Sequence, residues 1–271
     1  MTVPRGQARP PEAPLPSDEI IFIGSGGGRM TTMTQLRATG GLWVSMDGTQ
    51  ISVDPGPGAL VHCRSRKLGL DPATLDAVIL THKHLDHAGD VNAMIEAMTT
   101  GGIKKRGYVY APRDAYEDDP VILRYVREYP EGSGIFEPGG RYSIGKIALE
   151  TPLRLRHPVE TYGLRFLGSR YTVSLIACTG YFPELEEAFV GDLLILNVVY
   201  KEPRDAIHLA IPDARRLITT LRPKLAVLTH FGMTMLRAKP WELADALAQE
   251  TGVRVLAARD GWRLSLNDVL V

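Results

Sequence analysis

The sequence predicts an α+β protein in which two β-sheets pack against each other and are covered by helices. Apolar runs punctuated by turn residues are concentrated in two stretches, residues 20–54 and 142–176, as in short strands. From about residue 192 onward, similar runs alternate with helix-like segments. Because a sheet buries its apolar face against a second layer, this pattern favours two packed sheets flanked by helices.

The length and composition are those of a folded globular protein, with 271 residues of which 44% are hydrophobic and 23% charged. Five prolines among the first sixteen residues remove backbone donors and favour an extended chain. We therefore predict a Pro-rich N-terminal arm over residues 1–18 and one domain over residues 19–271. The arm could hold a second subunit of a homo-oligomer, although a disordered tail has the same composition.

Charge and cysteine content exclude several classes of protein. Thirty-one basic and 31 acidic residues balance, so no overall field attracts the chain to nucleic acid or to an anionic membrane. No apolar run approaches the length of a membrane span, and the first residues lack the apolar stretch of a signal peptide. Cys63 and Cys178 are too few and too far apart for a disulfide framework. We expect a cytoplasmic protein with no membrane partner.

The individual elements follow from local patterns. The run 20–24 is a predicted strand that enters a glycine turn, 25–29, which lacks the lysine of a phosphate-binding P-loop. Turn residues Asp47 and Gly48 separate two further strands, the second of which ends at Asp54. Later elements are strands at 77–81, 109–111, 192–199, 225–230, 253–258 and 262–266, and helices from about 89 and over 120–129, 212–221 and 241–252.

A dense cluster of metal-ligand residue types follows the strand predicted at 77–81. Within six residues stand His82, His84, Asp86 and His87, although the whole chain has only 7 histidines. Imidazole and carboxylate groups bind zinc, and a loop can curl so that all four face one ion. Without a metal, the same loop would crowd histidine charges. A polar surface loop with chance histidines is the weaker interpretation, so the cluster predicts a metal site.

The HxHxDH spacing of these residues resembles the signature of the metallo-β-lactamase superfamily. The resemblance implies a four-layer αββα sandwich of two mixed β-sheets flanked by helices, with one or two metals at the sheet edge. It also implies two later ligands, His157 in RLRHPVETYGLRF and His230 in LAVLTH, for which a structural histidine is the alternative. The implied ligand sets are His82, His84 and His157 for one metal, and Asp86, His87 and His230 for the other.

Cys178 departs from the pattern of the superfamily. It stands where phosphodiesterase-like relatives carry the aspartate of an Asp-Thr-Gly segment that bridges the two metals. A thiolate is a good ligand for zinc, and coordination lowers the pKa of the thiol. It cannot bridge as a two-oxygen carboxylate does, so a weaker, differently spaced or zinc-selective second site is expected. A small buried apolar cysteine at the end of a strand is the alternative.

Three further residues have predicted roles by resemblance. Asp54 matches an early aspartate that accepts a hydrogen bond from a ligand histidine, although an aspartate before proline also starts turns. His208 resembles a loop histidine that, in ribonuclease-Z-like members, helps proton transfer near the leaving group; local packing at the start of a helix is the alternative. Asp86 and His208 are thus the predicted catalytic residues, and His62 is taken as structural.

Metal-dependent hydrolysis is the chemistry that such a site predicts, because a metal lowers the pKa of bound water to about 7 and so supplies hydroxide at neutral pH. We predict one or two Zn²⁺, with Mn²⁺ or Fe²⁺ as alternatives. Segments HPVETYGLRF and CTGYFPEL resemble phosphodiesterase-like members, and the only basic cluster, 104–106, is short. The predicted substrate is therefore a small phosphodiester rather than a large nucleic acid. A lactone or ester hydrolase, and a metal-binding protein without turnover, are the alternatives.

Overall fold

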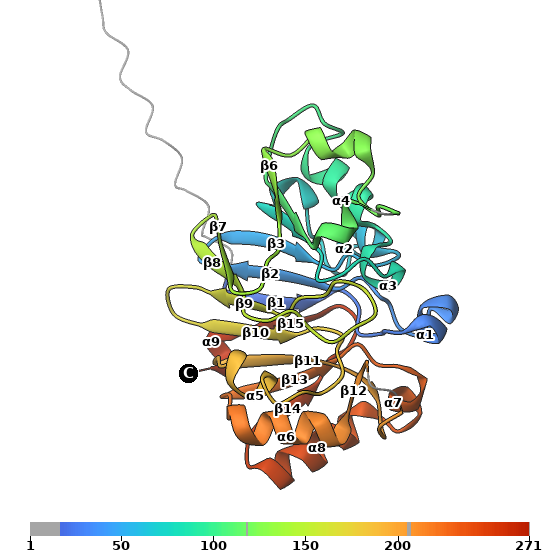
Figure 1. Cartoon of the computed structure of the whole chain (residues 1–271), viewed down its shortest axis with the longest axis vertical. Helices are drawn as coiled ribbons and strands as arrows, with labels where there is room; N and C mark the ends of the chain where they lie inside the picture. Colours follow the sequence, from blue (N-terminus) through green and yellow to red (C-terminus); the bar gives the residue numbers. More distant parts are fainter. Residues whose placement is uncertain (1–16, 118, 205–206, 271) are drawn as a thin grey trace, which may run out of the picture.

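The structure, a computed structural model, describes residues 17–117, 119–204 and 207–270. Two mixed β-sheets face each other and helices cover their outer faces, as Figure 1 shows. The predicted α+β class and four-layer αββα arrangement are confirmed. The predicted Pro-rich arm, apart from Ser17 and Asp18, lies outside the described residues.

The first sheet has seven strands in the described part of the chain, in the order β15-β1-β2-β3-β4-β5-β6. Its pairs are antiparallel from β15 to β3 and parallel from β3 to β6. The predicted hairpin turn between β2 and β3 is confirmed, with positive φ at both Asp47 (50°) and Gly48 (80°). The strands are β1 (Glu19–Phe22), β2 (Leu42–Met46), β3 (Thr49–Val53), β4 (Ala77–Ile79), β5 (Tyr108–Ala111), β6 (Gly132–Ile135) and β15 (Trp262–Ser265).

The second sheet repeats this arrangement, in the order β14-β13-β11-β10-β9-β8-β7, with β12 (Leu209–Ala210) beside β11. Its pairs are antiparallel from β7 to β10 and parallel from β10 to β14. The strands are β7 (Gly140–Ile144), β8 (Ile147–Thr151), β9 (Leu164–Leu167), β10 (Thr172–Ile176), β11 (Leu193–Tyr200), β13 (Leu225–Thr229) and β14 (Arg254–Ala257).

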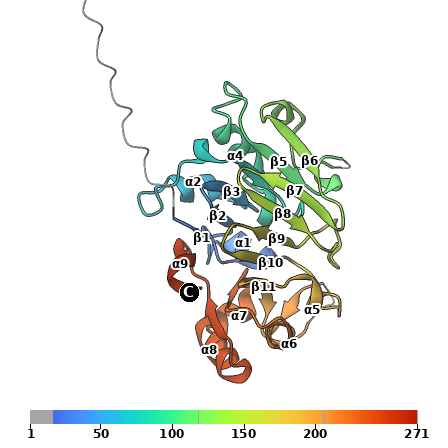
Figure 2. The same ribbon diagram turned by 90° about the vertical axis from the view of Figure 1, so that its left-hand side faces the viewer.

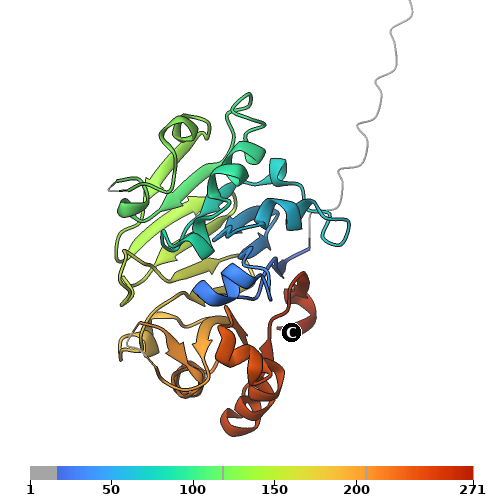
Figure 3. The same ribbon diagram turned by 90° about the vertical axis from the view of Figure 1, so that its right-hand side faces the viewer.

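Both faces of the central strands are buried, which explains why they are continuous apolar runs. In β1, alternate side chains point to opposite faces: Ile20 and Phe22 pack between the sheets, whereas Ile21 packs beneath the helices. Figures 2 and 3 show α2 and α4 on one outer side and α6 and α8 on the other. These four helices are α2 (Ala59–Arg64), α4 (Val91–Met98), α6 (Ile211–Leu221) and α8 (Pro240–Thr251).

The remaining helices are short, and several were not predicted. They are α1 (Arg29–Thr34), α3 (Leu85–Ala88), α5 (Leu185–Ala188), α7 (Met233–Arg237) and α9 (Leu266–Val269). The helix predicted from about residue 89 is confirmed as α4, which starts at Val91, whereas α3 forms in the segment before it that was predicted as a loop. In the described part of the chain, no helix has both the length and the apolar character needed to cross a membrane.

The α-helix predicted over residues 120–129 is wrong, because only a 3₁₀ turn forms there, at Arg124–Glu128. An α-helix would need the carbonyl of Ile122 to accept from the amide of Val126. That carbonyl instead accepts from the guanidinium of Arg127 at 2.8 and 3.0 Å, while the Val126 amide donates to Leu123. A side-chain donor thus competes with the helical bond.

Candidate metal centre

The predicted ligands lie where strands of both sheets end at one edge of the sandwich. His82 follows β4 of the first sheet, while Cys178 and His230 follow β10 and β13 of the second sheet. Because β4 and β10 belong to opposite sheets, the two loops meet only in the folded chain. His84 is the residue before α3, which places Asp86 and His87 in a single tight turn.

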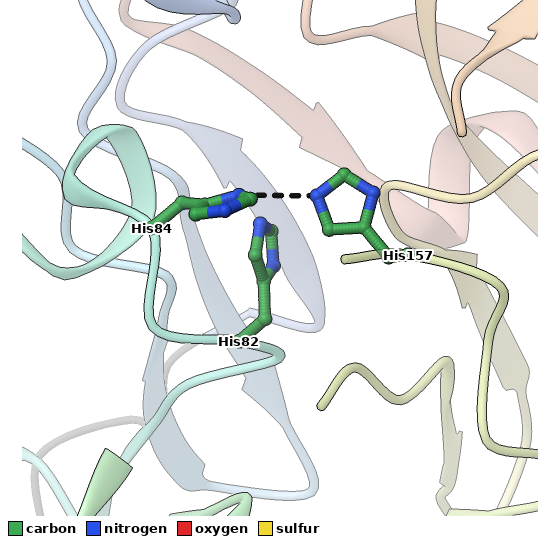
Figure 4. Close-up of side chains that lie close together, drawn as sticks. All are labelled: His82, His84 and His157. Carbon is green, nitrogen blue, oxygen red and sulfur yellow. Dashed lines mark hydrogen bonds between the residues drawn. The ribbon is translucent and has the colours of Figure 1, made fainter. Parts of the chain in front are cut away.

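The described residues contain three groups of donor atoms, and the atoms within each group lie within 4.8 Å of one another. Two of them correspond to the two implied ligand sets, and the third contains Cys178 and shares one histidine with each set. Figure 4 shows His82, His84 and His157 pointing toward one another. The groups are His82, His84 and His157; Asp86, His87 and His230; and His82, His87 and Cys178. All seven predicted ligands are thus brought together, whereas His62 and His208 belong to no group.

The hydrogen bonds of Asp54 fix how two of these histidines face the site. Its carboxylate accepts from the Thr81 amide and hydroxyl, both at 2.7 Å, and from His87 Nδ1 at 2.9 Å. Since the single hydroxyl proton of Thr81 goes to Asp54, the Thr81 oxygen accepts from His82 Nδ1, 3.0 Å away. The Nε2 atoms of His82 and His87 are therefore turned to the site. The predicted hydrogen bond between Asp54 and a histidine of the HxHxDH segment is confirmed, at His87.

His82 provides the clearest indication that a metal fits here. Its ring is fully buried, and its Nε2 has no hydrogen-bond partner in the described part of the chain. Leaving a buried polar atom unpaired costs about 1–3 kcal/mol. The ring centroid of His82 lies 4.0 Å from that of His87 and 4.9 Å from those of His84 and His157. An ion shared by these nitrogen atoms would satisfy Nε2, and imidazole, carboxylate and thiolate suit zinc.

His157 and His230 reach the site from loops of the second sheet. His157 Nδ1 donates to the carbonyl of Ile207 at 3.1 Å, which leaves Nε2 free to face His84 Nδ1 at 3.0 Å. His230 has φ 61°, and its Nε2 lies 3.5 Å from Asp86 Oδ2. A Cβ atom at Gly27 would be 2.3 Å from the ring of His230. The predicted glycine turn therefore allows the backbone to pass beside a site histidine.

Burial keeps most of these histidines neutral. It lowers the pKa of His82 far below its usual range, that of His157 to about 4 and that of His230 to about 3. Burial also opposes a charge on His87, but the carboxylates of Asp54 and Asp86 outweigh it and raise the pKa of His87. Neutral imidazole is the form that binds a metal, so among these histidines a metal would displace the proton of His87.

Cys178 lies between the two sets of ligands. Its side chain is buried, and Sγ lies 3.5 Å from His87 Nε2. The amide of Asn197, at the middle of β11, donates to the same sulfur at 3.6 Å. Burial raises the pKa of the thiol, so a nearby cation is needed for a thiolate at neutral pH. Nothing in the sequence around Asn197 marked it as part of the site.

The metal-free protein is expected to lose stability as the pH falls from about 6.5 to about 4. His157 and His230 have folded-state pKa values below the unfolded value of 6.5, so the unfolded state binds more protons in this window. The pKa of His87 is raised in the folded state, so its contribution to the free energy of unfolding is lost only as the pH rises through that pKa. Urea unfolding of metal-stripped protein at pH 7 and pH 5 checks this. The His157→Gln variant should show a smaller difference, and an equal difference would contradict the assignment.

Comparisons with known proteins identify the family of this chain. Residues 49–231, from β3 to just past His230, match the family described as the β-lactamase superfamily domain. The chain belongs to the metallo-β-lactamase superfamily. Members of this superfamily are mostly hydrolases, and its fold was predicted above from the HxHxDH segment.

Three relatives show how far the similarity to superfamily members extends. The chain is 33% identical to the uncharacterized protein MJ1374 of Methanocaldococcus jannaschii, over 92% of this chain and 95% of that protein. It is 27% identical to the probable metallo-hydrolase YhfI of Bacillus subtilis, over 71% and 80% of the two chains. It is also 27% identical to ribonuclease Z of Thermococcus kodakarensis, over 89% and 93%.

Solved structures share the metallo-β-lactamase fold. The crystal structure of YhfI superposes with a TM-score of 0.70 at 22% identity, over 90% of this chain and 98% of YhfI. A diphosphatase from the PhnP family gives a TM-score of 0.64 at 19% identity, over 91% and 96%. At these identities, the similarity shows that this chain shares its fold with YhfI and with the diphosphatase, and no more than the fold.

Proposed function

We propose that the protein is a metal-dependent hydrolase that acts on a small phosphodiester. The observation that carries this proposal is a cavity of about 730 Å³ whose lining includes six of the seven donor residues, all except His230, together with Arg29, Arg204 and His208. A cavity of this size is typical of sites for small molecules. Relatives named metallo-hydrolase and ribonuclease Z, and the fold shared with a diphosphatase, support the same chemistry.

The metal ligands in this proposal are the seven predicted residues. His82, His84 and His157 would hold one ion and Asp86, His87 and His230 a second, with Cys178 beside both sets. We propose Zn²⁺, one or two per chain, with Mn²⁺ or Fe²⁺ as alternatives. When bound, the metal would supply a Lewis acid that polarises the phosphoryl oxygen and lowers the pKa of water.

The residues of the chain have distinct roles in this proposal. Asp86 remains ionised because His87 and His230, together with the amide of Gly28 at 2.9 Å, lower its pKa in spite of burial. As a carboxylate it can therefore accept a hydrogen bond from a water molecule and orient that water next to the reacting phosphorus. The ring centroid of His208 lies 5.2 Å from that of His157, on the cavity wall. We propose that it gives a proton to the leaving alkoxide.

The position of the basic cluster 104–106 favours a small substrate over a large nucleic acid. The guanidinium of Arg106, in the basic cluster 104–106, donates to the carbonyls of Thr74 and Leu75 at 2.9 Å and is thus used within the fold. Among the described residues, none of that cluster lines the cavity. We also propose that the protein is cytoplasmic and that it forms a homo-oligomer. Cell fractionation tests the location, and the molecular mass in solution tests the oligomeric state.

Hydrolysis of bis(p-nitrophenyl) phosphate by the zinc-loaded protein tests the proposal. His208→Gln is expected to lower kcat about 100-fold or more on methyl phenyl phosphate, whose strongly basic leaving oxygen needs a proton, because a positioned proton donor contributes about 10²- to 10⁴-fold. The effect on bis(p-nitrophenyl) phosphate should be much smaller, because nitrophenolate leaves without a proton. The metal content should not change, since His208 belongs to no donor group. His62→Gln, on α2, is the matched control and should keep full activity.

Two other results would favour the alternatives. Faster hydrolysis of p-nitrophenyl butyrate or of a lactone than of the phosphodiester would indicate a carboxylic ester or lactone hydrolase. Stoichiometric metal binding without turnover of any of these substrates would indicate a metal-binding protein without catalysis.

A further inference from the structure

In the short helix α1, a polar side chain is buried while two apolar side chains face solvent. Thr31 is buried with its hydroxyl donating to the carbonyl of Phe231 at 3.2 Å, whereas Met30 and Met33 are 59% and 76% exposed. The two methionines are three residues apart and so lie on the same side of the helix. Figure 1 shows α1 standing out from the sheet edge, with α3 above it and α7 below it. The fold thus holds two thioether side chains in solvent beside the metal centre.

These methionines line the same cavity as six of the donor residues. The lining also contains Met233 of α7 and Leu85 of α3, and Leu85 is 73% exposed. Exposed apolar side chains that gather at a cavity mark a binding surface for an apolar group. Methionine is flexible and polarisable, so such a wall adapts to groups of varied shape.

The polar groups of the cavity are suited to a phosphate rather than to a nucleobase. Arg29 and Arg204 are on its lining, and the charge of Arg29 adds to the effect of burial in lowering the pKa of His84. Apart from Asp86, the described residues of the lining include no Asp, Glu, Asn or Gln. Asn and Gln read adenine, and Asp and Glu accept from cytosine, so the edges of these two bases find few partners among the described residues of the lining. An anionic head and an apolar tail without hydrogen-bonding edges fit this combination.

We propose that the substrate is a phosphodiester with an alkyl or aryl substituent that lies against Met30, Met33 and Leu85 while its phosphate faces Arg29 and the donor groups. This inference rests on the proposed hydrolase function. In the reaction, the oxygen of water bonds to phosphorus, the bond from phosphorus to the leaving oxygen breaks, and that oxygen takes a proton. The apolar substituent supplies binding energy away from the reacting atoms.

A series of alkyl p-nitrophenyl phosphates tests the substituent, because all members have the same leaving group. From methyl to hexyl, kcat/KM is expected to rise about two- to fourfold for each methylene that is buried. The double variant Met30→Ser, Met33→Ser should flatten this dependence. Val61→Ser is the matched control, since Val61 is 73% exposed on α2 and is not part of the cavity lining, and it should keep the wild-type dependence.

Calorimetric titration with methyl, butyl and hexyl phosphate separates this inference from the proposed function. Tighter binding of the longer phosphates, lost in the double variant, supports the apolar site even if no ester is hydrolysed. Hydrolysis of the methyl ester with no dependence on chain length would overturn the inference and leave the hydrolase proposal standing. So would a preference for the p-nitrophenyl ester of thymidine 5′-phosphate over the hexyl ester.

A contact between two copies of the chain is the other explanation for exposed methionines, and light scattering decides it. If the wild-type protein is a dimer that the double variant converts to a monomer, with the chain-length dependence unchanged, α1 is an interface and the inference is overturned. If the molecular mass is the same in both proteins and only the dependence changes, the methionines bind substrate.

Discussion

Replacing Asp54 with alanine is expected to lower the free energy of unfolding by about 3 kcal/mol and to weaken zinc binding about 10- to 100-fold. The buried carboxylate accepts from the Thr81 amide, the Thr81 hydroxyl and His87 Nδ1. Its removal leaves these donors without a partner. It also frees the Thr81 hydroxyl to rotate, so His82 loses the constraint that turns Nε2 toward the site. Urea unfolding and zinc titration against a competing chelator measure the two effects.

Asp71→Ala is the matched control for this substitution. Asp71 forms an ion pair with Arg64 at 2.8 Å, but its side chain is 55% exposed, so solvent screens the pair. We expect a loss of about 1 kcal/mol or less and unchanged zinc affinity. If Asp54→Ala bound zinc as tightly as the wild-type protein, the histidines would be oriented by packing alone, and the role assigned to Asp54 would be wrong.

Sequence patterns predicted most strands correctly because both faces of these strands are buried. An apolar run such as the one in β11 leaves few alternatives, and the turn residues Asp47 and Gly48 define the hairpin. The segments that failed have no such constraint. The six residues of α1 include three threonines, and its two methionines face solvent and not the core. Its conformation depends instead on tertiary contacts, such as the bond from Thr31 to Phe231.

The candidate site was predictable where ligand residue types are close together in sequence. His82 to His87 stand in one loop, so their spacing alone indicates a metal. Asn197 and Arg29 were not predicted, since an amide within an apolar strand and one arginine after a glycine run are common in any protein. Their proximity to the site arises from the pairing of β10 with β11 and from the path of the glycine turn.

Replacing Cys178 with alanine is expected to remove part of the bound metal and to lower hydrolysis of bis(p-nitrophenyl) phosphate about 100-fold or more. Its sulfur lies within 4.8 Å of a ring nitrogen of His82 and of a ring nitrogen of His87. These two histidines belong to different sets. Losing it therefore weakens the site where the two sets meet. Cys178→Asp should retain the metal, because a carboxylate supplies oxygen ligands at the same place.

The cobalt-substituted protein provides a direct readout of the thiolate. A sulfur bound to Co²⁺ gives a charge-transfer absorption, which should be present in the wild-type protein and absent from both Cys178→Ala and Cys178→Asp. Cys63→Ala is the control, since Cys63 is the only other cysteine, is buried on the inner face of α2, and has a thiol pKa that burial raises to about 12.

Cys63→Ala should lose stability, because the substitution leaves a cavity in the core. It should keep the absorption, because the site itself is unchanged. If the absorption persisted in Cys178→Ala, Cys178 would be the small buried residue at a strand end that the sequence also allowed. The donor groups would then reduce to two histidine-rich sets, and the site would work without the bridging position that the aspartate of phosphodiesterase-like relatives occupies.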